Sequence, residues 1–85
     1  MDIETIQKAL ADQIGSEILL RKTPLTSDED LFAAGFDSMS LSRVLVFVEE
    51  RFGVTIPDQD VVLDEVSTLR TMAAFVKTYV DRAGP

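Results

Sequence analysis

The chain has 85 residues, a net charge of −7 and a pI of about 4.3. It contains no cysteine and no histidine, which excludes a disulfide scaffold, a thiolate nucleophile and a Cys/His zinc site. The acidic balance argues against nucleic acid as a partner and favours basic protein surfaces. The N-terminus lacks the regions of a secretion signal and no apolar run is long enough to span a membrane, so we expect a cytoplasmic protein without membrane contact.

The first predicted helix starts after Asp2, a good N-cap residue, and continues to about Ile18. Its apolar residues recur at spacings of three and four, which places them on one face: Ile3, Ile6, Leu10, Ile14 and Ile18. Gly15 interrupts the helix at a cost of about 1 kcal/mol, so we expect the last turns to be weaker.

A long loop is predicted over residues 21–37, where Pro24 and Gly35 are among the residues that break the periodicity. We expect Leu25, Leu31 and Phe32 to attach this loop to the core. Long loops in compact domains are usually functional or disordered, and the apolar residues favour an ordered, functional loop.

The second predicted helix runs from about Ser38 to Arg51, and Gly53 stands where a glycine ends a helix. Its core stripe consists of Leu41, Val44, Leu45, Val48 and Phe52. No alternating strand pattern is longer than the stretch 54–56.

Pro57 disfavours helix at Ile56, so an extended link should follow the second helix. A short third helix is predicted over Asp58 to Leu63, with Val61 and Val62 facing inward. Ser67 or Thr68 is expected to cap the last helix, and the tail 83–85 is expected to fray. The apolar face of the last helix contains Leu69, Met72, Ala73, Val76 and Val80.

The segment Gly35-Phe36-Asp37-Ser38-Met39 is the strongest candidate site. An isolated Asp-Ser pair before a helix is most often only an N-cap. If Asp37 caps, however, Ser38 is the first helical residue and lies beside free backbone N–H groups, where a phosphodiester is tolerated. Because the chain has no histidine to act as a base, we interpret Ser38 as an acceptor that another enzyme modifies, rather than as a catalytic nucleophile.

The same segment resembles the pantetheinylation site of acyl and peptidyl carrier proteins. The resemblance covers essentially the whole chain in register, and three further stretches carry it: Asp30-Leu31-Phe32, Val48-Glu49-Glu50-Arg51-Phe52-Gly53-Val54 with Ile56-Pro57-Asp58, and Ser67-Thr68-Leu69. It implies an all-α four-helix bundle with a short third helix and a long loop between the first two. It also implies that Ser38 receives 4′-phosphopantetheine from coenzyme A, attached by a separate transferase, with Asp37 as the helix cap beside it.

The resemblance implies a carrier rather than an enzyme, which tethers an acyl or aminoacyl group as a thioester. Its partners would be a phosphopantetheinyl transferase, a loading ligase or acyltransferase, and downstream synthase or modifying enzymes. We expect one free-standing, monomeric carrier domain over residues 1–85, with a domain of a larger synthase as the alternative.

The outward face of the second helix departs from many fatty-acid carriers, in which this helix is strongly acidic. Here the expected docking face holds Met39, Ser42, Arg43, Val46 and Phe47, although the last two could instead belong to the core. This pattern resembles more closely that of carriers in polyketide and nonribosomal peptide biosynthesis, and the resemblance implies one of those pathways. A fatty-acid carrier and a helical adaptor without a cofactor remain as alternatives.

Two acidic clusters are weaker candidates for a metal site. Residues 27–30 and Asp58-Gln59-Asp60 gather oxygen atoms, but neither has the ligand spacing of a calcium loop, so we expect no metal. The apolar stripe of the last helix, with Phe75 and Tyr79, is interpreted as ordinary core packing.

Overall fold

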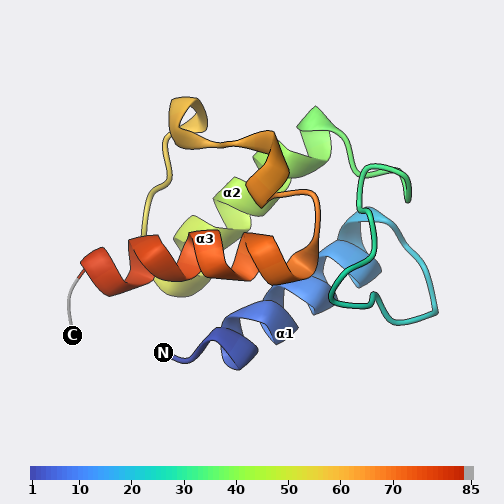
Figure 1. Cartoon of the computed structure of the whole chain (residues 1–85), viewed down its shortest axis with the longest axis horizontal. Coiled ribbons are helices and arrows are strands. Elements are labelled where there is room, and N and C mark those ends of the chain that lie inside the picture. Colours follow the sequence, from blue (N-terminus) through green and yellow to red (C-terminus); the bar gives the residue numbers. More distant parts are fainter. Residues whose placement is uncertain (84–85) are drawn as a thin grey trace.

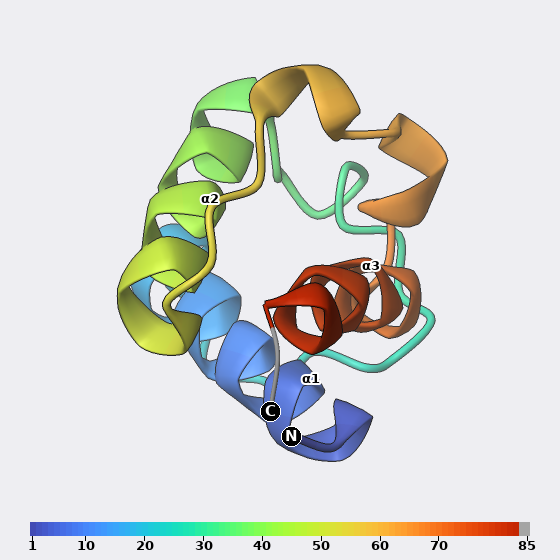
Figure 2. The same ribbon diagram turned by 90° about the vertical axis from the view of Figure 1, so that its left-hand side faces the viewer.

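The computed structural model describes residues 1–83, and the expected fraying at Gly84 and Pro85 lies outside them. The predicted all-α fold is confirmed: within the described residues the regular structure is helical throughout (Figure 1). The α-helices are α1 (Ile3–Gln13), α2 (Ser38–Phe52) and α3 (Leu69–Arg82). Viewed roughly along α3, α1 and α2 lie to one side of it, and the connection from α2 arches over to reach it (Figure 2).

The first helix begins and continues as predicted. The side chain of Asp2 accepts a hydrogen bond from the N–H of Thr5 at 2.8 Å, so it caps α1. The helix passes through Gly15 as a π-helical turn, η1 (Ile14–Ile18), in which the N–H of Leu19 donates to the carbonyl of Ile14. Of the predicted face, Ile6, Leu10 and Ile14 are fully buried and Ile18 packs against the core, whereas Ile3 is 37% exposed.

The helix α2 is capped at both ends by the expected residues. Asp37 precedes its first turn with an extended backbone, and Gly53 ends it in the left-handed conformation, with φ of 73°. Val44 and Val48 are buried, while the other predicted stripe residues Leu41, Leu45 and Phe52 pack against the core and remain partly exposed.

The long loop is attached to the core, but one of its expected contacts is wrong. Leu31 is fully buried and Leu25 is half-buried, as predicted. Phe32 is 38% exposed, whereas Phe36 is only 2% exposed and takes the inward position. The two rings meet edge to face, with centroids 5.8 Å apart. The chain turns sharply between them, and only one of the two aromatic rings fills the core.

The short third helix is formed differently from the prediction. Two separate 3₁₀ turns, η2 (Asp58–Asp60) and η3 (Leu63–Glu65), flank an extended pair of valines. Successive residues of an extended chain point in opposite directions, so only one valine can face inward. Val61 packs against the core, while Val62 is 51% exposed, so the expectation for Val62 was wrong.

The last helix closes the core over α1. Thr68, one of the two predicted caps, accepts a hydrogen bond from the N–H of Thr71. Four of the five predicted apolar residues of α3 are buried: Leu69, Met72, Ala73 and Val76. The connections add buried side chains of their own, namely Leu31, Phe36, Val54, Ile56 and Val66. Phe75 and Tyr79 pack against this core and meet each other edge to face, as expected for ordinary packing.

Candidate functional site

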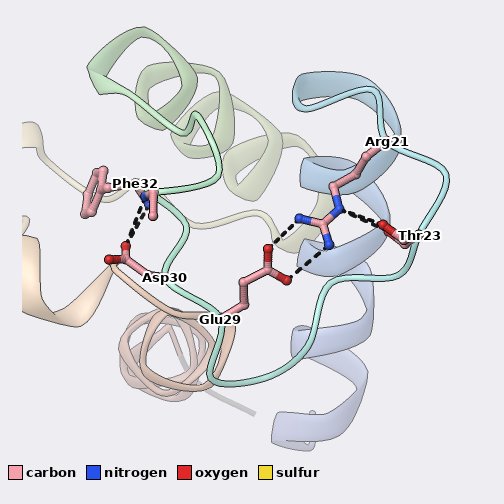
Figure 3. Close-up of polar contacts among 6 residues, drawn as sticks. Arg21, Thr23, Glu29, Asp30 and Phe32 are labelled. Carbon is pink, nitrogen blue, oxygen red and sulfur yellow. Dashed lines mark hydrogen bonds and ion pairs between the residues drawn. The ribbon is translucent and has the colours of Figure 1, made fainter.

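The end of the long loop is folded as a tight turn that leads into α2. Asp30 organises it: one oxygen of its carboxylate accepts hydrogen bonds from the N–H groups of Phe32 at 3.0 Å and Ala33 at 3.3 Å (Figure 3). The N–H of Phe36 donates to the carbonyl of Leu31 at 3.0 Å and closes the turn. The chain therefore enters α2 from a defined direction.

This turn is joined to the segment before α3. The N–H of Leu31 donates to the carbonyl of Ser67 at 2.9 Å, and the N–H of Arg70 donates to the carbonyl of Ser27 at 3.0 Å. The guanidinium of Arg70 also makes two hydrogen bonds to Asp28, at 2.7 and 2.9 Å. The loop is thus held at both ends of the stretch 27–31, so it forms an ordered platform for the start of α2.

The acidic side chains of the loop are used in these contacts. The guanidinium of Arg21 pairs with Glu29 through two nitrogens and also donates to Thr23 (Figure 3). Hydrogen bonds from Arg21 and Arg70 lower the pKa of Glu29 and of Asp28 respectively. Across residues 1–83, no three Asp or Glu side chains come together in a way that could hold a metal ion.

Gly35 sets the approach of the chain to α2. Its φ of 107° lies in the region that side-chain-bearing residues rarely adopt, and this explains the glycine. A Cβ atom built at Gly35 would lie 3.8 Å from a methyl carbon of Leu19, an ordinary contact distance. The backbone conformation, rather than lack of space, therefore demands glycine here.

Asp37 holds the first turn of α2 through a single partner, Ser40. One oxygen of the Asp37 carboxylate accepts from the N–H of Ser40 and from the hydroxyl of Ser40, both at 2.9 Å. These two hydrogen bonds lower the pKa of Asp37, so its carboxylate is a weak base. Sequence reasoning missed Ser40, which is 9% exposed; its signal was a polar residue three positions after an N-cap, as in a capping box.

Ser38 is the first residue of α2, and its side chain is exposed. Its hydroxyl takes part in none of the side-chain hydrogen bonds that the structure shows for residues 1–83, and its carbonyl accepts from the hydroxyl of Ser42 at 3.2 Å. Asp37, the neighbouring carboxylate, is occupied by Ser40. The hydroxyl of Ser38 is therefore accessible from outside, with no strong base of its own chain bound to it.

The residues of the expected docking face differ in their exposure to solvent. Met39 is 77% exposed and Val46 is 56% exposed, and Ser42 and Arg43 are exposed between them. Phe47 is half-buried and packs against the core, in edge-to-face contact with Phe52. The exposed stripe thus runs from the start of α2 to Val46 and leaves Phe47 at its inner margin.

The family of the chain is shown by a comparison of its sequence with family models. Residues 4–76 match the model described as phosphopantetheine attachment site, a span that runs from α1 into α3. The chain belongs to this family. It is a carrier protein of the acyl and peptidyl carrier type, with a covalently attached 4′-phosphopantetheine group.

The start of α2 in this carrier protein fits such a group. An exposed hydroxyl is the acceptor that a phosphodiester needs, and it lies at a helix start where backbone N–H groups and the helix dipole favour negative charge. When bound, the group supplies a thiol, which the chain itself lacks.

No helix within residues 1–83 combines the length and apolar character needed to span a membrane.

Proposed function

We propose that Ser38 carries the phosphopantetheine arm. The observation that supports this most directly is the exposed hydroxyl of Ser38 at the first position of α2, directly after the cap Asp37. In the transfer, the Ser38 oxygen attacks the phosphorus of coenzyme A that bears the pantetheine. The phosphoanhydride bond breaks, adenosine 3′,5′-bisphosphate leaves, and the hydroxyl proton passes to a base of the transferase.

The carrier then presents cargo without doing chemistry of its own. An acyl or aminoacyl group is loaded on the thiol by a ligase or acyltransferase and is passed to downstream synthase or modifying enzymes. Supporting this division of labour, one oxygen of the carboxylate of Asp37, the residue before Ser38, accepts two hydrogen bonds from Ser40. We further propose that residues 1–85 act as one monomeric domain.

The pathway we favour is polyketide or nonribosomal peptide biosynthesis. The support is the stripe of α2 nearest Ser38, in which Met39 and Val46 are exposed and apolar and Arg43 is the only charged residue. A partner with a basic docking surface would find no carboxylate on this stripe to pair with. The acidic residues Glu49 and Glu50 lie near the far end of α2, so a fatty-acid carrier is the less favoured alternative.

The attachment is tested by intact mass after incubation with coenzyme A and a phosphopantetheinyl transferase. The wild-type protein should gain the mass of one phosphopantetheine and Ser38→Ala should gain none. Ser42→Ala is the matched control for the attachment residue, because Ser42 is another exposed serine one turn further along α2, and it should still gain the mass of one phosphopantetheine. Modification that persists in Ser38→Ala would place the arm on another residue.

A second experiment tests the pathway. The pantetheinylated protein is offered to an aminoacyl-adenylating ligase, a polyketide acyltransferase and a fatty-acid-synthesis acyltransferase, and the loading rates are compared. We expect one of the first two to load it faster than the third. Fastest loading by the fatty-acid enzyme would reverse the pathway assignment and leave the carrier role unchanged.

A further inference from the structure

The residue that ends the first helix has a conformation that its side chain does not favour. Leu20 has a φ of 52°, and it is the only non-glycine residue with a positive φ among residues 1–83. Left-handed backbone conformation is disfavoured for residues with a Cβ atom, and glycine or asparagine is the usual choice at such a helix end. An outlier of this kind calls for an explanation, either in the fold or in the function.

The fold explains the backbone conformation at position 20, but it does not explain why the residue there is a leucine. Just past Leu20, the N–H of Arg21 donates to the carbonyl of Gly15 at 2.9 Å, which closes the helix end and requires the chain to turn at this position. A buried leucine could offset its backbone cost by packing. The side chain of Leu20 is 76% exposed, so its burial contributes little to the stability of the folded state.

Two contacts place the end of η1 beside the segment that enters α2. The side chain of Leu19 lies next to Gly35, and Arg43 donates a hydrogen bond to the carbonyl of Glu17 at 3.1 Å. Gly35 is only three residues from Ser38, a span of roughly 10 Å at most. The end of the first helix therefore approaches the segment that enters α2, and the exposed Leu20 directly follows Leu19 at that end.

Other apolar side chains are exposed before and at the start of α2. Met39 follows Ser38 directly and is 77% exposed, and Phe32 in the turn before α2 is 38% exposed. With Leu20 they come from three different segments: the end of the first helix, the long loop and α2. Exposed apolar residues on segments that lead to a functional group are typical of a contact surface, whereas single exposed leucines need no explanation.

We infer that Leu20 is a contact residue for the phosphopantetheinyl transferase. This rests on the proposed attachment at Ser38. The transferase must bring the phosphorus of coenzyme A to the Ser38 hydroxyl itself, so its surface has to close over the residues around that serine. Enzymes that act on the loaded thiol meet the far end of the arm, and the exposed stripe of α2 is the surface on which they need to dock. The partner should offer an apolar surface to Leu20 beside its active site.

The test compares three substitutions at Leu20 in the whole apo protein. Leu20→Asn tolerates the left-handed conformation and is polar, Leu20→Gly removes the side chain, and Leu20→Met keeps an apolar side chain on the same backbone. Melting temperature and the kcat/KM for modification by a purified transferase with coenzyme A are measured for each. We expect Leu20→Asn and Leu20→Gly to melt about 4 °C higher than the wild type.

The same two variants should be modified about tenfold more slowly, because an apolar contact is lost, while Leu20→Met keeps the wild-type rate. Leu20→Asn is included because slower modification of Leu20→Gly alone could result from a more flexible turn. Wild-type rates in Leu20→Asn and Leu20→Gly would overturn the inference and leave the attachment at Ser38 standing. Failure of the wild-type protein itself to gain mass would instead refute the proposed function.

Discussion

The guanidinium of Arg43 donates a hydrogen bond through Nη2 to the backbone carbonyl of Glu17 at 3.1 Å. The carbonyl groups at a helix end have no partner within the helix, so this contact both satisfies one of them and joins α2 to the end of η1. Arg43 also lies on the exposed stripe proposed for docking. A substitution at Arg43 therefore changes a structural contact together with a surface charge, and the two effects have to be separated.

We predict that Arg43→Glu lowers the rate of loading by the pathway enzyme and raises the rate for a fatty-acid-synthesis enzyme, because a surface charge acts on association and on rejection of wrong partners. It should also lower the melting temperature, because a carboxylate cannot donate to the Glu17 carbonyl. Arg43→Gln removes the charge but keeps an N–H donor, so its loading should change with a smaller loss of stability. Loading rates at low and moderate salt are measured beside thermal melts.

The control for Arg43→Glu is Lys8→Glu, which makes the same change in net charge at an exposed position of α1. We expect Lys8→Glu to leave both loading rates close to those of the wild type. Equal effects of the two substitutions would show that overall charge matters rather than the face of α2. Wild-type loading by Arg43→Gln and Arg43→Glu would exclude Arg43 from partner choice.

The cap Asp37 should give the stability a specific dependence on pH. Its pKa in the folded protein lies below the ordinary value of 3.8, because the N–H and hydroxyl of Ser40 donate to the carboxylate. A lowered pKa means that the charged cap stabilises the fold above the ordinary pKa and that this contribution is lost as the pH falls through the folded pKa. We predict that Asp37→Ala lowers the melting temperature by about 5 °C at neutral pH.

The difference between the wild type and Asp37→Ala should shrink below about pH 4 and be smallest near pH 2. The pKa values of Asp2, Asp28 and Glu29 are lowered as well, but these residues are common to both proteins and cancel in the difference. Urea unfolding of both proteins between pH 2 and pH 7 measures this difference in stability. A difference that is independent of pH would mean that the charge of Asp37 does not matter. The modification rate of Ser38 should also fall in Asp37→Ala.

The two phenylalanines of the loop should differ strongly in their contribution to stability. Phe36 is 2% exposed, so Phe36→Ala leaves a cavity and should cost about 3–5 kcal/mol in the free energy of unfolding. Phe32 is 38% exposed, and Phe32→Ala should cost about 1 kcal/mol or less. Urea unfolding monitored by circular dichroism measures both. If Phe36→Ala unfolds completely in water, the milder Phe36→Leu should still be less stable than Phe32→Ala. The reverse order would contradict the burial of Phe36.

Much of this fold was predictable because its signals are local. Asp2, Asp37 and Thr68 each cap a helix through a hydrogen bond to a residue three positions away, and Gly53 ends α2 with a left-handed backbone. Such contacts involve residues that are close in the sequence, so residue type and spacing are enough to place them. The position of Ser38 at the start of α2 follows from the same local signals.

The remaining features depend on contacts between residues distant in the sequence. Only the packed core decides that Phe36 turns inward rather than Phe32, because both are equally apolar and lie in one irregular loop. The segment between α2 and α3 forms two 3₁₀ turns rather than a short helix, and Asp60 there accepts a hydrogen bond from Tyr79 on α3, 19 residues away. Arg43 meets Glu17 across 26 residues, and the end of η1 reaches Gly35. The sequence by itself therefore determined the three α-helices and the position of Ser38 at the start of α2. The tertiary structure decided which segments pack beside the start of α2, because those segments are brought together only when distant parts of the chain fold against one another.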